Sequence, residues 1–223
     1  MNTRELVNYL EGLAENNNRA WFVMNKPSYD ILRAEFVELV GRVIAGTARF
    51  DPAVGGQEAK KALFRINRDV RFSKDKSPYK SNFSAVIAPG GKKDPGSHYY
   101  FHVDEKGKLL VAGGCYMPPN DVLLKIRQRI AAEPAAFTRL LRNKTMIDYY
   151  GGFSEEGKLV RPPKGFDADT PHIEYIKQKS FIMVRELPVK GMTGERLLKE
   201  IESGFKAALP LVKWLRAAVE AGK

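Results

Sequence analysis

The residues of this sequence with the clearest chemical potential lie in one basic segment, Arg65 to Lys80, with the sequence RINRDVRFSKDKSPYK. Its arginines and lysines are separated by short, regular gaps, and two aspartates and a tyrosine lie among them. Arginine binds phosphate and carboxylate oxygens through paired hydrogen bonds, and lysine adds a mobile positive charge. The segment therefore predicts a site for an anion. A solvated, self-paired edge of the fold is the alternative.

The positive charge of the chain is concentrated in this segment. The sequence of 223 residues has 37 Lys and Arg against 26 Asp and Glu, a formal net charge of +11. Between Lys60 and Lys80, eight cations accompany two anions, so +6 of that charge lies there. A basic balance favours anionic partners such as phosphorylated metabolites or nucleic acid. Because a basic total often reflects solubility alone, the local concentration is the more informative observation.

Residues 62–72 alternate apolar and polar side chains, which is typical of a strand with one face in water. Same-face side chains on a strand lie about 6.6 Å apart. The polar face carries Arg65, Asn67, Asp69 and Arg71. We expect Asp69 to contact both arginines and to leave guanidinium donors for an external anion. Arg68 falls on the apolar face, where a carboxylate or a backbone carbonyl must pair with it.

After this expected strand, the residues SKDKSPYK indicate a turn that carries lysines and a tyrosine. A further cation comes from the proline-rich loop RPPKGF, which either closes over the basic segment or only connects two helices. The predicted ligand-binding residues are Arg65, Arg68, Asp69, Arg71, Lys74, Asp75, Lys76, Tyr79 and Lys164. A salt-bridge network that only stiffens the fold is the structural alternative for the same residues.

Three residues are candidates for proton transfer beside a bound anion: Tyr79, His102 and Asp69. The segment SHYYFHVD favours a strand, which places His98 and His102 about 13 Å apart. They cannot then share one metal ion, and we predict no metal site. Partly exposed histidines of a sheet are the structural alternative to a general base. The single cysteine, Cys115, lacks a catalytic signature around it.

The order of the expected elements predicts an α+β fold. Helical patterns occupy residues 1–46 and 119–223, and strand patterns occupy residues 60–117. The segments SHYYFHVD and KLLVAGGCYM flank the turn EKG as a hairpin, and SFIMVREL adds a later strand. We expect an antiparallel sheet of at least four strands, packed against helices from the N- and C-terminal parts, in a single domain over residues 1–223.

The basic segment also resembles the signature of a known family. The pattern R-x-x-R-D-x-R-F-x-x-x-D-K-x-x-Y is filled by Arg65, Arg68, Asp69, Arg71, Phe72, Asp75, Lys76 and Tyr79. It is similar to that of a mostly bacterial family known as the domain of unknown function 2461. The resemblance extends to NNNRAWF, GGCYMPP and PPKGFDADTPH. It implies that the signature residues are important, and it implies no reaction.

Several common enzyme classes lose their main support. The sequence has no Walker motif, no G-x-G-x-x-G, no H-E-x-x-H and no G-x-S-x-G. Its beginning lacks the apolar core of a signal peptide, and no apolar run approaches the length of a membrane span. We therefore expect a cytoplasmic protein without a membrane partner.

Three hypotheses of function remain. The first is a domain that binds a small phosphorylated or carboxylated ligand at the basic segment, with catalysis left open. The second is a non-catalytic interaction or structural protein. The third is nucleic-acid binding through a basic sheet face with aromatic side chains. No residue pattern indicates a particular cofactor, reaction or oligomeric state.

Overall fold

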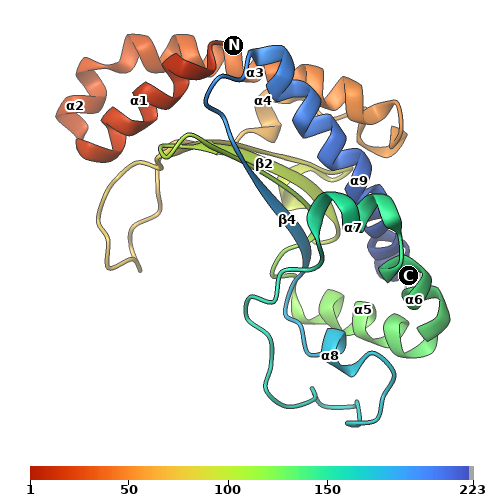
Figure 1. Ribbon diagram of the computed structural model, residues 1–223. Coiled ribbons are helices and arrows are strands. Elements are labelled where there is room, and N and C mark those ends of the chain that lie inside the picture. Colours follow the sequence, from red (N-terminus) through yellow and green to blue (C-terminus); the bar gives the residue numbers. More distant parts are fainter. Residues whose placement is uncertain (221–223) are drawn as a thin grey trace. The chain divides into compact units, whose positions relative to one another are not determined.

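The computed structural model describes residues 1–220, in which helices form both ends of the chain and strands form its middle (Figure 1). The last three residues of the predicted C-terminal segment, 221–223, lie outside the described residues. The helices are α1 (Thr3–Glu15), α2 (Arg19–Met24), α3 (Lys26–Ala48), α4 (Ala59–Ala62), α5 (Asn120–Ala132), α6 (Pro134–Leu141), α7 (Lys144–Tyr150), α8 (Ile173–Ile176) and α9 (Gly194–Glu220). Two short 3-10 turns span Pro52–Val54 and Gly91–Lys93.

One antiparallel sheet contains β1 (Asn82–Ile87), β2 (His98–Asp104), β3 (Lys108–Cys115) and β4 (Phe181–Pro188). The strands follow one another across the sheet in chain order. The predicted EKG turn joins β2 to β3, where Gly107 has a positive φ of 66° and Asp104 accepts two backbone N–H groups. The architecture confirms the α+β prediction with its four-stranded sheet.

The density of internal contacts divides the chain into two compact units, and each is described by itself. The first unit contains Met1–Lys92, Tyr100–Val111 and Glu186–Ser203. The second contains Lys93–Tyr99, Ala112–Arg185 and the described chain from Gly204 onward. The chain passes between the units several times, so neither unit is one continuous stretch of sequence.

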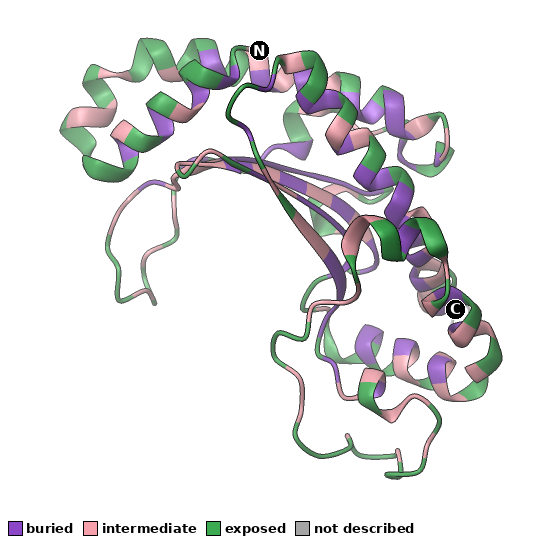
Figure 2. Ribbon diagram, in the orientation of Figure 1, coloured by how far each residue is buried: buried purple, intermediate pink, exposed green. Residues whose placement is uncertain are grey.

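In the first unit, helix α3 covers one face of the strands with aromatic side chains. The ring of Phe36 lies 5.4 Å from that of Phe83 on β1 and 5.5 Å from that of Phe101 on β2. Burial alternates strictly along β2, so its even-numbered residues lie on the opposite, half-exposed face (Figure 2). This alternation leaves Tyr100 and His102 accessible on the face that α3 does not cover.

In the second unit, helix α9 packs closely against a glycine-rich strand. A Cβ atom at Gly113 would lie 2.3 Å from the Cβ of Ala208, and one at Gly114 would lie 2.1 Å from the carbonyl oxygen of Phe181. The bare backbone of the two glycines therefore makes room for a helix and a neighbouring strand. Stacking of Phe205 on Tyr99, at 4.9 Å between centroids, completes this contact.

The expected strand over residues 62–72 is wrong. Helix α4 ends at Ala62, and only isolated bridges follow, at Leu63 and Asn67. The alternating pattern is misleading because the segment pairs with its own continuation: the Arg68 amide donates to Pro78 O, and the Lys80 amide donates to Ile66 O. The result is a loop that extends from the sheet, drawn in dull yellow in Figure 1. At its tip Phe72, expected on the apolar face, is 95% exposed.

Among the described residues, no helix is both long enough and apolar enough to cross a membrane.

Candidate functional site

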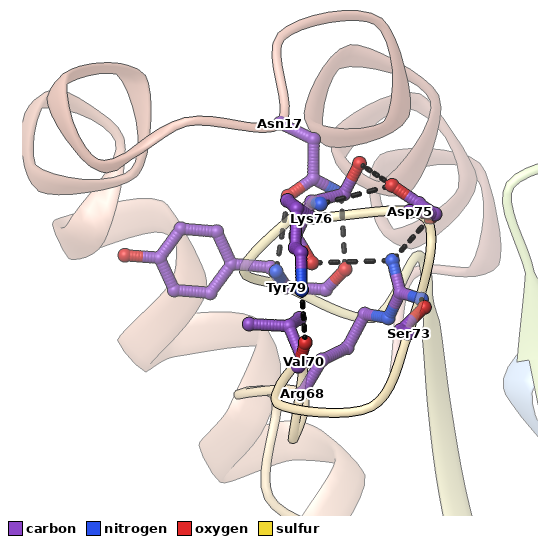
Figure 3. A network of polar contacts seen from close by, with 8 residues as sticks. Asn17, Arg68, Val70, Ser73, Asp75, Lys76 and Tyr79 are labelled. Atoms are coloured by element: carbon purple, nitrogen blue, oxygen red, sulfur yellow. Dashed lines mark hydrogen bonds and ion pairs between the residues drawn. The ribbon is translucent and has the colours of Figure 1, made fainter.

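The loop that carries the signature residues, 65–80, is called the signature loop. A polar network holds it together in the first compact unit (Figure 3). The Arg68 guanidinium is paired with the Asp75 carboxylate and donates to the carbonyl oxygen of Ser77 at 3.1 Å. The other Asp75 oxygen accepts the Ser77 amide at 2.9 Å and the Ser77 hydroxyl at 2.6 Å. We call these three residues the Arg68–Asp75 network. Arg68 thus has the carboxylate and carbonyl partners that the sequence predicted.

The electrostatics of this network favour an ionised aspartate. Hydrogen bonds from the Ser77 side chain and amide, followed by that from Arg68, lower the pKa of Asp75 to about 2. Each of these bonds stabilises the charged carboxylate. Because the carboxylate already accepts these donors and neutralises Arg68, the network has little positive charge left for an external anion.

Tyr79 ties the loop to the N-terminal helices. The side-chain amide of Asn17 accepts from the Tyr79 N–H and donates to the Tyr79 carbonyl, both at 3.0 Å (Figure 3). The Tyr79 ring is 7% exposed and stacks on Phe22, with centroids 4.2 Å apart and planes 18° apart. The tyrosine therefore has a packing role in the signature.

The tip of the loop carries the other predicted cations. Arg71 donates to both oxygens of Asp69, at 2.9 Å and 2.7 Å, and this pairing lowers the pKa of Asp69. Lys76 donates to the carbonyl oxygen of Val70 at 3.0 Å, and Lys74 is exposed. Asp69 was expected to bridge two arginines, but its hydrogen bonds go to Arg71, and Arg65 acts on it only through its charge. Arg71 is therefore neutralised within the loop, whereas Lys74 and Lys76 form no ion pair within the described part of the chain.

A second group of cations surrounds Phe64 at the start of the loop. The Nζ atoms of Lys80 and Lys92 lie 5.0 Å and 5.8 Å from the centre of the Phe64 ring. Burial, and then the charges of Arg65 and Lys92, lower the pKa of Lys80. We call Arg65, Lys80 and Lys92 the cation trio. Within the described part of the chain, none of the three forms an ion pair with a carboxylate, although Lys92 donates to Leu63 O at 2.6 Å.

Lys80 belongs to the cation trio and also lines a hollow beside the Arg68–Asp75 network. This polar hollow has a volume of about 350 Å³, and its lining includes Asn17, Arg68, Asp75, Tyr79 and Lys80. A volume of this order suits a small ligand. The loop network therefore shapes one wall of a concavity and fixes the backbone next to Lys80.

A row of hydrogen-bonding side chains lies beside Phe64 on the half-exposed face of the sheet. Phe64 meets Tyr100 edge to face, with centroids 6.2 Å apart. The Tyr100 hydroxyl lies 3.0 Å from Nδ1 of His102, and Tyr100 is also hydrogen-bonded to the Ser84 side chain. Burial lowers the pKa of His102, partly opposed by nearby carboxylates, and favours the neutral imidazole.

Other residues singled out from the sequence lie in the second compact unit. Lys164 is an exposed residue of a loop there, and His98 is a half-buried residue whose pKa is lowered by burial. Cys115 is buried with Sγ 3.2 Å from Gly96 O, and burial raises its pKa to about 12, which disfavours the nucleophilic thiolate. No group of three or more metal-ligating side chains gathers anywhere in residues 1–220.

The ligand-binding residues predicted from the sequence leave out three members of this site: Phe64, Lys92 and Tyr100. Phe64 was assigned to an apolar face, but it is 39% exposed, and the Nζ atoms of Lys80 and Lys92 both lie within 6 Å of its ring centre. Lys92 belongs to the turn after β1, which returns to Leu63. The one available signal was the lysine pair in GGKKD, a turn that follows a strand candidate.

Comparison with known proteins adds a family to this geometry. No curated protein and no solved structure matches the chain. A family model described as "Conserved hypothetical protein (DUF2461)" matches residues 5–214, which is nearly the whole chain and includes the loop, the cation trio and the sheet. The chain therefore belongs to the DUF2461 family.

Proposed function

We propose that this protein binds a small anionic ligand, phosphorylated or carboxylated, at the cation trio. The observation that carries the proposal is three neighbouring cations around Phe64 without a carboxylate paired to any of them. Burial, and then repulsion from Arg65 and Lys92, lowers the pKa of Lys80 and so disfavours its charged form. A bound phosphate or carboxylate relieves that repulsion and gains charge-assisted hydrogen bonds.

The signature residues do not all contact the ligand in this proposal, but they hold the backbone that carries Lys80. Lys80 follows Tyr79 directly, and the pairing of the Lys80 amide with Ile66 O fixes its backbone. The stacked Tyr79 ring and the Arg68–Asp75 network hold the loop that carries Lys80. In this proposal Arg65 is the one signature arginine that meets the ligand, and Arg68 has a positioning role.

The structural hypothesis has its own support for part of the segment. The Arg68–Asp75 and Arg71–Asp69 pairs satisfy their own charges within the loop. Those four residues fit a salt-bridge network, whereas the cation trio does not. A small anionic metabolite as ligand is also consistent with the cytoplasmic location expected from the sequence.

Ligand-induced stabilisation of the full chain tests the proposal. The melting temperature is measured in moderate salt with phosphate, pyrophosphate, citrate and a panel of phosphorylated sugars and carboxylic acids. A ligand present at 100 times its Kd stabilises a protein by about 2.7 kcal/mol. That corresponds to a rise of about 5–10 °C for a chain of this size.

Lys80→Gln is the test variant, and Lys74→Gln is its matched control because it removes the same charge from the exposed tip. We expect Lys80→Gln to abolish most of the stabilisation and Lys74→Gln to retain it. Equal losses in both variants mean that only the net charge matters. A shift with oligonucleotides alone, falling steeply with salt, supports the nucleic-acid hypothesis instead. No shift with any compound overturns the proposal.

A further inference from the structure

The half-exposed face of the sheet in the first unit carries an ordered chain of three hydrogen-bonding side chains. Tyr100 and His102 are two residues apart on β2 and therefore lie on the same face. Ser84 on the adjacent β1 is 5% exposed and contacts the same tyrosine. These three residues are absent from the family signature. They take no part in the packing of α3 or in the hairpin turn.

The directions of these hydrogen bonds follow from the chemistry of the groups. Burial raises the pKa of Tyr100, and a hydrogen bond with the Ser84 side chain opposes this only in part, so the phenol keeps its proton. The Tyr100 proton is then available for Nδ1 of His102, 3.0 Å away. A neutral histidine that accepts at Nδ1 carries its proton on Nε2. The row therefore leads from Ser84 through Tyr100 to His102.

Carboxylates near His102 stabilise the protonated form of its imidazole. Asp104, Glu186 and Glu105 all act on the imidazole and favour its protonated form, in that order of strength. Glu186 is itself paired with Lys108 at 2.7 Å, so it remains ionised. The resting imidazole is neutral because burial outweighs these charges. A proton added to His102 is nevertheless stabilised by these three carboxylates.

Phe64 links this row to the cation trio. The Nζ atoms of Lys80 and Lys92 lie within 6 Å of the centre of this ring, which also meets the Tyr100 ring in an edge-to-face arrangement. An anion held by the two ammonium groups is thus one aromatic ring away from the tyrosine. A ligand held at the lysines would need a hydroxyl group several bonds from its phosphate or carboxylate to meet the tyrosine.

We propose that Tyr100 and His102 form a general-base relay for a hydroxyl group of the ligand, which is a phosphorylated or carboxylated alcohol. The inference rests on the proposed anion site. In the step, the ligand O–H bond breaks and its proton bonds to the Tyr100 oxygen, while the Tyr100 proton moves to Nδ1 of His102. The products are a ligand alkoxide and an imidazolium, and charge is conserved. Tyr100 is the catalytic residue, and Ser84 and His102 act through it.

Two matched ligands separate the relay from the anion site. Glycerol 3-phosphate and propyl phosphate share the phosphate group, but only the first has hydroxyl groups. We expect both to raise the melting temperature of the full chain in a Lys80-dependent manner. The first should bind about fivefold more tightly, which is the gain from one hydrogen bond. Tyr100→Phe should remove that preference while both ligands still bind. Tyr116→Phe, an exposed tyrosine of the second unit, is the control.

Nitrogen-15 NMR of histidine-labelled protein reads the relay directly. In the free wild-type protein we expect His102 as the neutral Nε2–H tautomer, with an Nδ1 signal that changes in Tyr100→Phe and shifts further with glycerol 3-phosphate. An Nδ1–H tautomer, or equal binding of the two phosphates with an unresponsive His102, overturns the relay and leaves the anion site standing. If neither phosphate stabilises the protein and the panel is also silent, the anion site fails, and the relay fails with it.

Discussion

The Arg68–Asp75 network and most of the cation trio belong to the same basic loop, yet the charges of the network are paired and those of the trio are not. Arg68 has a carboxylate and a carbonyl as partners, and its aspartate is held by further donors. Lys80 has two cations as electrostatic neighbours and an aromatic ring beneath it. The charge of Arg68 is therefore balanced without a ligand, whereas the charges of the cation trio are not balanced by any carboxylate of the described residues.

The contrast teaches that local charge density does not locate an anion site. The carboxylates of Asp69 and Asp75 pair with residues two and seven positions away, which neutralises Arg71 and Arg68. The remaining cations of the segment keep their charge, and among them Lys80 has further cations as neighbours. Lys80 lies beyond their reach, next to a cation contributed by a separate turn. Predictions that disturb the two regions separately should therefore give different outcomes.

The largest expected effect comes from Tyr79→Ala in the loop region. The tyrosine is 7% exposed and stacks on Phe22, so its removal leaves a cavity between the loop and α2. Aromatic-to-alanine changes in such places cost about 3–5 kcal/mol. We expect a lower melting temperature and a lower free energy of unfolding in urea, by about 3 kcal/mol.

Tyr79→Phe is the matched control, because it keeps the ring and removes only the hydroxyl group. It should lie close to the wild type in stability and should retain ligand-induced stabilisation. This outcome separates the packing role of Tyr79 from the proton-transfer role predicted from the sequence. A Tyr79→Phe protein that is stable but no longer responds to ligands that stabilise the wild type would restore the catalytic assignment.

A smaller effect is expected from Arg68→Ala. The change removes the donor to Ser77 O and leaves that part-buried carbonyl without its protein partner. One such hydrogen bond contributes about 1 kcal/mol. Urea unfolding should show a loss of that size, together with a weaker anion response because Lys80 is less well positioned. An anion response that vanishes with unchanged stability would instead make Arg68 a direct ligand contact.

The sequence was sufficient for the sheet and for the partners of Arg68. The segment SHYYFHVD, predicted as a strand, forms β2, and the predicted EKG turn joins it to β3. These predictions succeed because each depends on local residue preferences and on the turn residues between two strands. The requirement that a part-buried arginine find a carboxylate or carbonyl is equally local.

The site itself depends on contacts that periodicity does not encode. Residues 62–72 alternate like a strand, but their amides pair with the loop's own return at Pro78 and Lys80. The approach of Lys92 to Phe64 depends on where the turn after β1 ends. A single sequence gives the residue types in both segments and not their proximity. The segment was therefore predicted as a strand with its polar residues on one face, whereas it forms a loop.

The smallest expected effect concerns the pH dependence of the network. The pKa of Asp75 is lowered to about 2 in the folded chain, against about 3.9 for a free aspartate. A depressed carboxyl pKa stabilises the fold above the unfolded pKa, and this contribution disappears as the pH falls from about 4 through about 2. The difference in stability between wild type and Asp75→Asn should therefore be constant from pH 5 to 7 and shrink below pH 4.

Urea unfolding of both proteins at several pH values measures that difference, and carboxyl carbon-13 NMR measures the Asp75 pKa directly. The cation trio contains no carboxylate, so Lys80→Gln should give a stability difference that stays constant through the same acid range. This opposite behaviour is expected because the network depends on an ionised acid and the trio lacks one. A wild-type minus Asp75→Asn difference that stays level down to pH 2.5 would mean that the carboxylate charge contributes nothing to the loop. The hydrogen bonds of Ser77, which an asparagine oxygen can also accept, would then suffice to hold it.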